Sequence, residues 1–303
     1  MADTFGVDVG GTKIEAKVFD AAWNTLRSRR VPTPDRYDDL VAALTDLVGW
    51  LRGDRAGRMR IGFGLPGYID PATGESMTTN IDANGRGLRH ALSAIPDVDP
   101  VFENDCNCFA LSEAVLGAGR GYRTVVGLIL GTGVGGGIVI DGRLLAGTRG
   151  VVGEFGHIGI PATLANRYRL PMVTCGCGRI GCYETLASGR GLPRLCEALT
   201  GRRASGREIA AEAAAGSNAM QGVLDVWGEI VAELISAIQC IADPDCIVLG
   251  GGLSGMAGVE ERLRKATNPI LLPAIAKPAI LRPEGGDSSG TRGAALLTQE
   301  NRS

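Results

Sequence analysis

The chain has 303 residues, of which 45% are hydrophobic, and a formal net charge of −2 at pH 7. This length allows two domains with a large core, and the balanced charge excludes the basic footprint of a nucleic-acid-binding protein. No apolar run approaches the roughly 20 residues of a membrane span, and the N-terminal residues do not resemble a signal peptide. We therefore expect a cytoplasmic protein that binds neither nucleic acid nor membrane.

The first part of the chain predicts an α/β lobe that begins with a hairpin. A strand at Thr4–Val9 leads into the turn Gly10-Gly11-Thr12-Lys13 and a returning strand at Ile14–Asp20. The elements that follow are a helix over Asp35–Leu51, a strand over Ile61–Leu65 and a helix over Cys106–Leu116.

The same design recurs later in the chain. A strand at Thr124–Leu130 is followed by a glycine-rich turn at Gly131–Gly137 and a returning strand at Ile138–Ile140. A repeated strand–turn–strand unit predicts two related α/β lobes that face each other across a cleft. The further expected elements are helices over Leu186–Leu199, Gly206–Ala215, Met220–Ala242 and Thr291–Leu297, and a strand over Cys246–Leu249 that ends at Gly250-Gly251-Gly252.

The glycine turns are candidate nucleotide-binding elements, because consecutive N–H groups without side chains form a concave anion site. Asp8 stands beside the first turn and would hold the hydration shell of Mg²⁺, while Thr12 and Lys13 would donate to phosphate oxygens. Gly251 and Gly252 would offer a flat surface to adenine. The alternatives are ordinary hairpin turns, a structural role for Asp8 as a turn cap, and a simple helix-start loop at the last site.

Asn104 and Asp105 follow a strand end at Val101–Phe102. In a cleft between nucleotide-binding turns, Asp105 is a candidate general base for a sugar hydroxyl, and Asn104 would hold a neighbouring hydroxyl. The alternative is that Asn-Asp only caps the helix that follows.

Four zinc-type ligands lie within 26 residues: His157, Cys175, Cys177 and Cys182. Three thiolates and one imidazole complete a tetrahedral structural zinc site that leaves no position for water. The alternative is buried free thiols and a core histidine. The remaining cysteines show no second ligand spacing and are expected in the core; they are Cys106, Cys108, Cys196, Cys240 and Cys246.

Two carboxylates flank the zinc motif, Glu154 in GEFGH and Glu184 in GCYE. The ion would orient both toward one pocket, and His157 would contact metal and ligand through its two ring nitrogens.

The chain resembles the ROK family of bacterial sugar kinases and related repressors, in the actin-like ATPase superfamily. The resemblance runs through DVGGTKI, GLPG, ENDCNCFALSEA, GLILGTGVGGGIVIDG, GEFGH, CGCGRIGCYETLASGRG, DPDCIVLGGGLS and GDSSGTRGAA. It implies a two-lobed, ribonuclease H-like sugar kinase fold with a zinc-bound loop. The small lobe would comprise residues 1–117 and a C-terminal helix over 291–303. The large lobe, residues 118–290, would hold the second phosphate turn, the zinc site and the adenosine site.

The resemblance also implies site residues and partners. Asp105 would be the general base, with Asn104, Glu154, His157 and Glu184 on the sugar and zinc on the four ligands. ATP phosphates would lie on the turns, and we expect a homodimer. The implied nucleotide contacts are Asp8, Gly10, Gly11, Thr12, Lys13, Gly131, Thr132, Gly133, Gly135, Gly136, Gly251 and Gly252.

Two departures from the family pattern bear on substrate and chemistry. Many glucose-specific relatives carry a tryptophan in the sugar loop, whereas this chain reads Thr79-Asn80-Ile81-Asp82-Ala83-Asn84-Gly85-Arg86. The absence of the tryptophan side chain would leave room for a larger substituent at C2 of the sugar, beside the expected sugar contact Asn80. Cys106 replaces the usual alanine after the catalytic aspartate, which should not change the chemistry.

The function implied is ATP-dependent phosphorylation of N-acetyl-D-glucosamine at the 6-hydroxyl, as in the kinases of the family that this chain resembles most. Fructokinase or glucokinase of the same family is the alternative enzyme. A sugar-responsive ROK repressor is the alternative of another class. It is disfavoured because the phosphate hairpin begins within the first ten residues, where repressors carry a winged helix.

Overall fold

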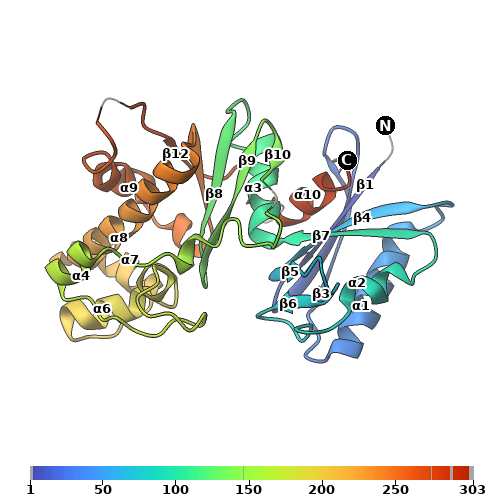
Figure 1. Ribbon diagram of the computed structural model, residues 1–303, viewed down its shortest axis with the longest axis horizontal. Helices are drawn as coiled ribbons and strands as arrows, with labels where there is room; N and C mark the ends of the chain where they lie inside the picture. The colour runs from blue at the N-terminus through green and yellow to red at the C-terminus, as the bar shows by residue number, and fades with distance from the viewer. Residues whose placement is uncertain (1–2, 146, 274, 287–288, 300–303) are drawn as a thin grey trace. The chain divides into compact units, whose positions relative to one another are not determined.

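The computed structural model describes residues 3–145, 147–273, 275–286 and 289–299 (Figure 1). Contacts within the chain divide it into two compact units. The first consists of Met1–Gly117, Gly142–Val152 and Glu284–Ser303, and the second of Ala118–Asp141 and Gly153–Pro283. The four C-terminal residues of the helix expected over 291–303 lie outside the described residues.

The first unit is built on the sheet β3-β2-β1-β4-β7. The strands β1 and β2 form the predicted hairpin, and β4 and β7 continue the sheet parallel to β1. Its elements are β1 (Thr4–Val9), β2 (Lys13–Phe19), β3 (Thr25–Pro32), α1 (Tyr37–Arg52), β4 (Met59–Leu65), β5 (Gly67–Ile69), β6 (Ser76–Thr78), α2 (Leu88–Ser93), β7 (Val98–Asn104), α3 (Asp105–Leu116), β10 (Arg143–Leu144) and α10 (Ser289–Leu296).

The hydrophobic pattern explains how α1 covers this sheet. Leu40, Leu44, Leu47, Val48 and Leu51 recur at helical spacing and are all buried, so they form one apolar stripe. This stripe joins the side chains of β1, β2 and β4 in one core. In Figure 1, α1 and α2 lie against one face of the sheet, while α3 and α10 lie against the other.

The second unit repeats the arrangement. The antiparallel pair β8–β9 is continued by the parallel strands β11 and β12, which confirms the predicted repeat. Three residues separate the paired strands in both hairpins, Gly10–Thr12 and Gly131–Gly133. The elements are β8 (Thr124–Leu130), β9 (Val134–Ile140), η1 (Phe155–His157), α4 (Ala162–Tyr168), α5 (Glu184–Ala187), α6 (Leu192–Thr200), α7 (Gly206–Ala214), α8 (Asn218–Ala242), β11 (Cys246–Gly250), η2 (Gly252–Gly255), α9 (Val259–Thr267) and β12 (Ala279–Leu281).

The single helix predicted over Leu186–Leu199 is wrong. The chain forms α5, leaves the helical path at Ser188, and starts again as α6. The Ser188 hydroxyl accepts a hydrogen bond from the Gly191 N–H at 3.0 Å, and the Gly189 N–H donates to the Gly131 carbonyl at 2.7 Å. The hydrogen bond between Gly189 and Gly131, which are far apart in the sequence, therefore interrupts the predicted helix between α5 and α6.

The expected burial of the non-ligand cysteines holds for three of the five. Cys108, Cys196 and Cys246 are buried, Cys106 is partly exposed and Cys240 is exposed. Cys240 lies near the end of α8, where its neighbour Ile241 is also 68% exposed. The helix extends beyond the core at this point, so helical spacing alone does not bury a residue.

The C-terminal helix α10 packs closely against β1, β4 and α3. A side chain at Gly6 would overlap the Thr291 carbonyl, one at Gly62 the Ala294 carbonyl, and one at Gly293 the Cys108 carbonyl. Glycine at these crossings permits backbone to lie on backbone.

A buried carboxylate fixes the segment that enters α10. Glu113 on α3 is fully buried and accepts hydrogen bonds from the N–H groups of Glu284 and Gly285, each at 2.9 Å. The Ser289 hydroxyl donates to the same carboxylate at 2.7 Å. Since a buried charge is tolerated only when hydrogen-bonded or paired, Glu113 specifies where this segment joins α3.

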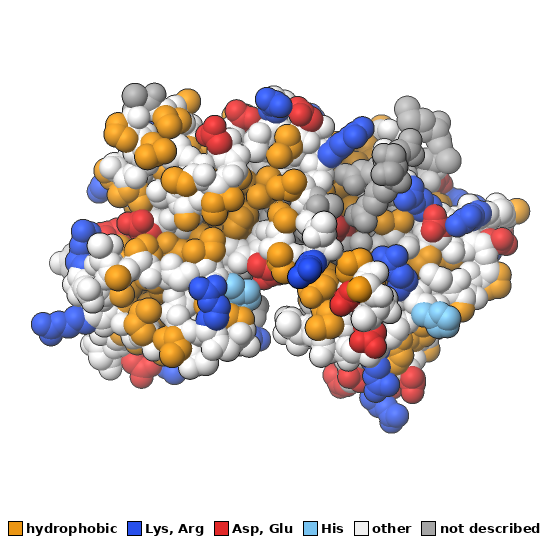
Figure 2. Space-filling view, viewed as in Figure 1, with side chains coloured by type: hydrophobic (Ala, Val, Ile, Leu, Met, Phe, Trp, Pro, Cys, Tyr) orange, Lys and Arg blue, Asp and Glu red, His pale blue; other side chains and the backbone are white. Residues whose placement is uncertain are grey.

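Charged side chains of both signs are scattered over the face shown in Figure 2. No helix among the described residues is both long and apolar enough to cross a membrane.

We predict that Gly293→Ala destabilises the protein by about 2–3 kcal/mol, because overpacking a close backbone contact forces neighbouring backbone to shift. Gly222→Ala is the matched control. Gly222 also lies in a helix, α8, but nothing lies within 4 Å of a side chain placed there, so alanine should be neutral or stabilising by up to about 1 kcal/mol. Thermal unfolding followed by circular dichroism measures both, and equal melting temperatures would contradict the packing argument.

Candidate active site

The first unit gathers its functional side chains at the carboxyl ends of β1, β4 and β7. Asp8 lies near the end of β1, and Asp105 follows β7 as the first residue of α3. Gly64 on β4 lies between them: a side chain there would be 3.7 Å from Asp8 Oδ1 and 3.8 Å from the Asp105 Cα. Ligand sites of open parallel sheets form at this edge, so the topology brings together two carboxylates that are 97 positions apart in the sequence.

Asp8 is a carboxylate in an unfavourable place for negative charge. Burial raises its pKa to about 6, with further contributions from Asp105 and Glu15, while Lys13 and Lys17 act in the opposite direction. A turn cap would accept hydrogen bonds from the N–H groups of the turn. No described residue donates a hydrogen bond to the Asp8 carboxylate, so the described residues do not support the turn-cap alternative. A cation beside Asp8 would relieve the repulsion from Asp105.

Asp105 is partly buried, and desolvation raises its pKa above the ordinary value. Hydrogen bonds from Cys106 oppose this shift, among them one from the backbone N–H to Oδ1 at 2.8 Å. Its place at the start of α3 favours the ionised form through the helix dipole. A partly buried carboxylate with few partners and a raised pKa has the properties of a general base.

Asn104 is the N-cap of α3. Its Oδ1 accepts from the N–H groups of Cys106 at 2.8 Å and Asn107 at 3.4 Å, so Asn104 caps the helix. Its Nδ2 donates to the Gly67 carbonyl at 3.2 Å, which leaves one amide hydrogen for another acceptor. The cap holds the Asp105 backbone at the strand-to-helix junction.

The first glycine turn is closed by its own backbone. The Gly10 N–H donates to the Lys13 carbonyl at 2.9 Å, and the Thr33 hydroxyl donates to the Gly10 carbonyl at 2.6 Å. A side chain at Gly11 would meet the Asn80 carbonyl at 2.9 Å. The predicted sugar-loop residue Asn80 therefore lies directly against the predicted phosphate turn, a contact made possible by the absence of a side chain at Gly11.

The second glycine turn is shorter than predicted. It comprises Gly131, Thr132 and Gly133, whereas Gly135 and Gly136 belong to β9 and pair with Ile129 and Leu128. Gly136 is buried, and a side chain there would overlap the Phe155 ring.

The turn at Gly251 lies close to this second turn. A side chain at Gly131 would be 3.8 Å from the Gly251 Cα. The second unit thus brings Gly131, Gly189 and Gly251 together from three separate segments.

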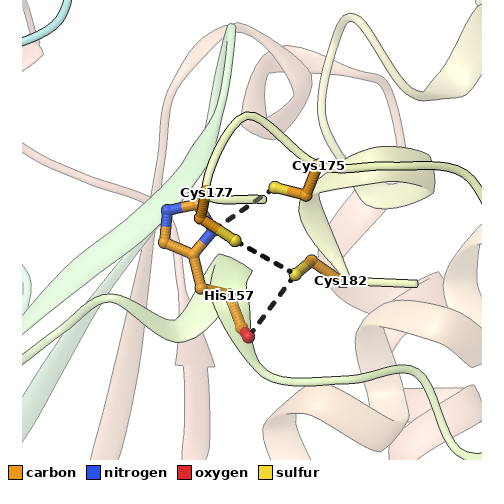
Figure 3. Close-up of side chains that lie close together, drawn as sticks. All are labelled: His157, Cys175, Cys177 and Cys182. Carbon is orange, nitrogen blue, oxygen red and sulfur yellow. Dashed lines mark hydrogen bonds between the residues drawn. The ribbon is translucent and has the colours of Figure 1, made fainter. Parts of the chain in front are cut away.

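The four predicted metal ligands converge in the second unit (Figure 3). Their ligand atoms all lie within 4.8 Å of one another. Cys177 Sγ is 3.7 Å from Cys182 Sγ, and Cys175 Sγ is 3.5 Å from His157 Nδ1. Zinc–sulfur bonds of about 2.3 Å and zinc–nitrogen bonds of about 2.0 Å in a tetrahedron require edges of about 3.8 Å and about 3.6 Å. The donor set and its spacing fit tetrahedral zinc.

The loop that carries the ligands is a tight backbone knuckle. The Cys175 N–H donates to the Arg179 carbonyl at 2.7 Å, and the Gly178 N–H donates to the Cys175 carbonyl at 2.9 Å. Gly178 has φ +85°, a conformation that side chains disfavour. Burial raises the pKa of Cys175 and raises that of Cys182 to about 12, whereas the backbone N–H of Arg179 lowers the pKa of Cys177. Zinc binding would remove the protons from the buried thiols.

Two carboxylates contact this cluster. Glu154 Oε2 lies 3.5 Å from His157 Nε2, the ring nitrogen that faces away from Cys175. Glu184 Oε1 accepts from the Cys175 thiol at 3.7 Å, and its Oε2 accepts from the Val134 N–H at 3.1 Å. Glu184 therefore connects the metal-ligand cluster to the start of β9, directly after the second glycine turn.

A sequence profile of the ROK family matches residues 4–301. The chain belongs to the ROK family. The "N-acetyl-D-glucosamine kinase" of Pectobacterium atrosepticum is 40% identical, with 97% of this chain and 98% of that protein covered. The "N-acetylgalactosamine kinase AgaK" of Shewanella sp. (strain ANA-3) is 39% identical, with 97% and 96% covered. The solved ROK hexokinase from Thermus thermophilus is 32% identical over 97% of each chain, with a TM-score of 0.86.

As a ROK protein the chain has the predicted mixed α/β, actin-like ATPase fold. The sequence interpretation missed some residues that shape the site. Gly67 holds the Asn104 amide, Thr33 closes the first turn, and Gly189 contacts the second. Gly290 on α10 abuts the Asp8 carboxylate. Gly67 in GLPG, Gly189 in CGCGRIGCYETLASGRG and Gly290 in GDSSGTRGAA stood in motifs that carry the family resemblance, but none of the three was assigned a role.

We predict that the purified protein contains about one zinc ion per chain and that Cys177→Ser loses it, because three donors remain from a four-donor site. The melting temperature should fall with the metal, since structural zinc contributes to folding free energy. Cys240→Ser, which changes an exposed cysteine outside the cluster, is the control and should keep both properties. Metal analysis that finds no zinc in active wild-type protein would refute the structural-site assignment.

Proposed function

We propose that this ROK protein transfers the γ-phosphoryl group of ATP to the 6-hydroxyl of N-acetyl-D-glucosamine. The observation that carries the proposal is the pair of partly buried carboxylates, Asp8 and Asp105, whose pKa values are both raised, beside a glycine turn at the carboxyl ends of the parallel strands. A general base and a cation-holding carboxylate are the two acidic functions that phosphoryl transfer to an alcohol requires. The names of the two curated relatives supply the sugar class.

In this mechanism Asp105 accepts the proton of the 6-hydroxyl as its oxygen attacks the γ-phosphorus, and the bond between the γ-phosphorus and the β–γ bridging oxygen breaks to release ADP. Asp8 would hold the hydration shell of the Mg²⁺ that accompanies ATP, and the ion would neutralise charge on the phosphates. The raised pKa of Asp8 fits this role, because burial and then the neighbouring charge of Asp105 disfavour the bare carboxylate, and a cation would offset both effects.

The glycine turns position the phosphates through backbone N–H groups. The Gly10 and Gly131 N–H groups already donate within their own turns, so the proposed donors are the next residues, Gly11 and Thr12 in one turn and Thr132 and Gly133 in the other. Lys13 adds a positive charge. Gly251 and Gly252 present backbone to the adenosine.

Both units contribute proposed sugar contacts: Asn80 and Asn104 from the first, and Glu154, His157 and Glu184 from the second. The zinc cluster would act indirectly. Its ligand Cys182 stands two residues before Glu184, so a bound ion would hold the backbone that carries Glu184, and it would also orient His157. We also propose that the protein is a homodimer and acts in the cytoplasm, where ATP is available.

N-Acetylgalactosamine is the second candidate substrate, because the relative that bears its name is 39% identical, against 40% for the N-acetylglucosamine kinase. These two sugars share the 2-acetamido group and differ in configuration at C4. The described loop from Thr79 to Arg86 contains no tryptophan, so no indole of this loop would compete with an acetamido group for space. Glucose and fructose lack this group.

We predict that Asp105→Asn lowers kcat by about 10²–10⁴-fold, the usual effect of removing a general base. Sugar binding measured by calorimetry should remain detectable. Asp99→Asn is the matched control and should retain turnover, because Asp99 lies on β7, the strand that precedes Asp105, and forms exposed ion pairs with Arg58 and Arg60. Near-normal turnover of Asp105→Asn would require another residue to be the base.

The pH profile gives the same prediction a second readout. Burial raises the pKa of Asp105, so a larger fraction is protonated in mildly acidic solution and cannot accept a proton. The kcat/KM of the wild type should therefore fall as the pH drops through a value above the roughly 3.9 of an unperturbed aspartate. Circular dichroism across the same range separates this loss from unfolding.

We predict a kcat/KM for N-acetylglucosamine at least about tenfold above that for glucose, fructose or mannose, because a site that binds an acetamido group rejects analogues that lack it. A coupled ADP-release assay at subsaturating sugar measures the ratio, and ³¹P NMR of the product identifies the phosphorylated hydroxyl. A higher kcat/KM for N-acetylgalactosamine would make that sugar the assigned substrate and would leave the assignment as an acetamido-sugar kinase unchanged. A higher value for glucose or fructose would overturn the substrate class.

A further inference from the structure

The second unit contains a pocket of about 490 Å³ that no step of the proposed mechanism uses. This volume lies within the range of small-ligand sites. The pocket is lined by Arg190, Pro193, Arg194, Arg203, Ala204 and Ser205. Arg190 lies in the segment between α5 and α6, Pro193 and Arg194 lie in the first turn of α6, and the other three residues lie in the segment that leads into α7.

The pocket adjoins both glycine turns of the second unit. On one side, Arg190 directly follows Gly189, whose N–H donates to the Gly131 carbonyl at 2.7 Å. On the other side, Gly206 directly follows Ser205, and a side chain at Gly206 would lie 3.5 Å from Leu253 Cδ2. Leu253 follows Gly252. A ligand whose phosphates occupied the glycine turns would therefore have this pocket next to it.

The lining carries three guanidinium groups and no carboxylate. Arg194 Nη1 donates to the Thr185 carbonyl at 2.6 Å, and Arg203 makes an exposed 3.6 Å ion pair with Glu197. Arg190 makes no hydrogen bond or ion pair with any residue that the structure describes. It is thus the guanidinium available to a ligand, and guanidinium groups stack on aromatic rings as well as donating hydrogen bonds.

The polar side-chain groups of the lining act as hydrogen-bond donors. Arginine has no acceptor atom. The Ser205 hydroxyl already accepts from the Glu208 N–H at 3.3 Å as the cap of α7, so its own proton is the group that remains to donate. Pro193 and Ala204 add apolar surface. A flat aromatic ring with acceptor atoms at its edge matches this combination.

We infer that the pocket holds the nucleobase of the nucleoside triphosphate donor, stacked on Arg190, and that it accepts a 6-oxo purine as readily as adenine. This inference rests on the proposed kinase function. The amino group at C6 of adenine is a donor and needs an acceptor, whereas O6 of guanine or hypoxanthine is itself an acceptor. Because the side chains of the lining are hydrogen-bond donors, they do not favour the C6 amino group of adenine over the O6 atom of guanine or hypoxanthine.

The first test compares kcat/KM for ATP, GTP and ITP at saturating sugar. We expect the three values to agree within about tenfold, because strong discrimination requires a hydrogen bond that one nucleobase cannot make. A preference for ATP above this factor would overturn the proposed nucleobase tolerance.

The second test uses Arg190→Gln, which keeps a polar side chain and removes the charged planar group. We expect the KM for each nucleotide to rise about five- to tenfold, in line with the loss of a stacked cation, and the KM for the sugar to stay unchanged. Calorimetric binding of ADP should weaken by the same factor, and this readout needs no turnover. Arg207→Gln, an exposed arginine on α7 outside the pocket, is the control and should leave both values unchanged.

These outcomes separate the inference from the function on which it rests. Wild-type affinity for ADP in Arg190→Gln would overturn the assignment of the pocket. Weakened ADP binding in that variant, with no phosphorylation of any sugar by the wild type, would keep the pocket as a nucleotide site and overturn the proposed kinase reaction.

Discussion

The first unit depends on the close packing of α10 against β1, β4 and α3. Three glycines, Gly6, Gly62 and Gly293, let backbone lie on backbone where side chains would overlap carbonyl groups, and the buried carboxylate of Glu113 fixes the segment that enters the helix. Gly290 of α10 abuts the Asp8 carboxylate. The helix therefore contributes to the burial that raises the pKa of Asp8.

In the second unit, a cluster of metal-ligating side chains, and not helix packing, fixes the positions of the site residues. Its cysteine and histidine side chains converge in one cluster, and Glu184 connects that cluster to the backbone beside the second glycine turn. A metal ion at such a site replaces many apolar contacts as a source of rigidity, because its bonds are strong and directional. The loop can therefore be rich in glycine and still present carboxylates in fixed positions.

The two units differ in the charges that they carry. The first supplies negative charge, with two partly buried carboxylates whose repulsion a cation would relieve. The second supplies backbone N–H groups at its turns and three guanidinium groups in the neighbouring pocket. A nucleoside triphosphate with its magnesium ion carries the charges that complement this pattern: anionic phosphates, a bound cation and an aromatic ring.

The sequence by itself determined the α/β class, both hairpins, the metal-ligand set and the candidate general base, because each has a local signature: alternation of apolar residues, glycine at turns, close ligand spacing, or Asn-Asp after a strand. It did not reveal that the helix predicted over Leu186–Leu199 breaks to reach Gly131, that Gly136 is buried within a strand, or that Cys240 is exposed. It also gave no sign that Glu113 anchors the approach to α10 or that Asn80 lies against Gly11. These features arise from contacts between residues far apart in the chain, so tertiary structure alone decided them.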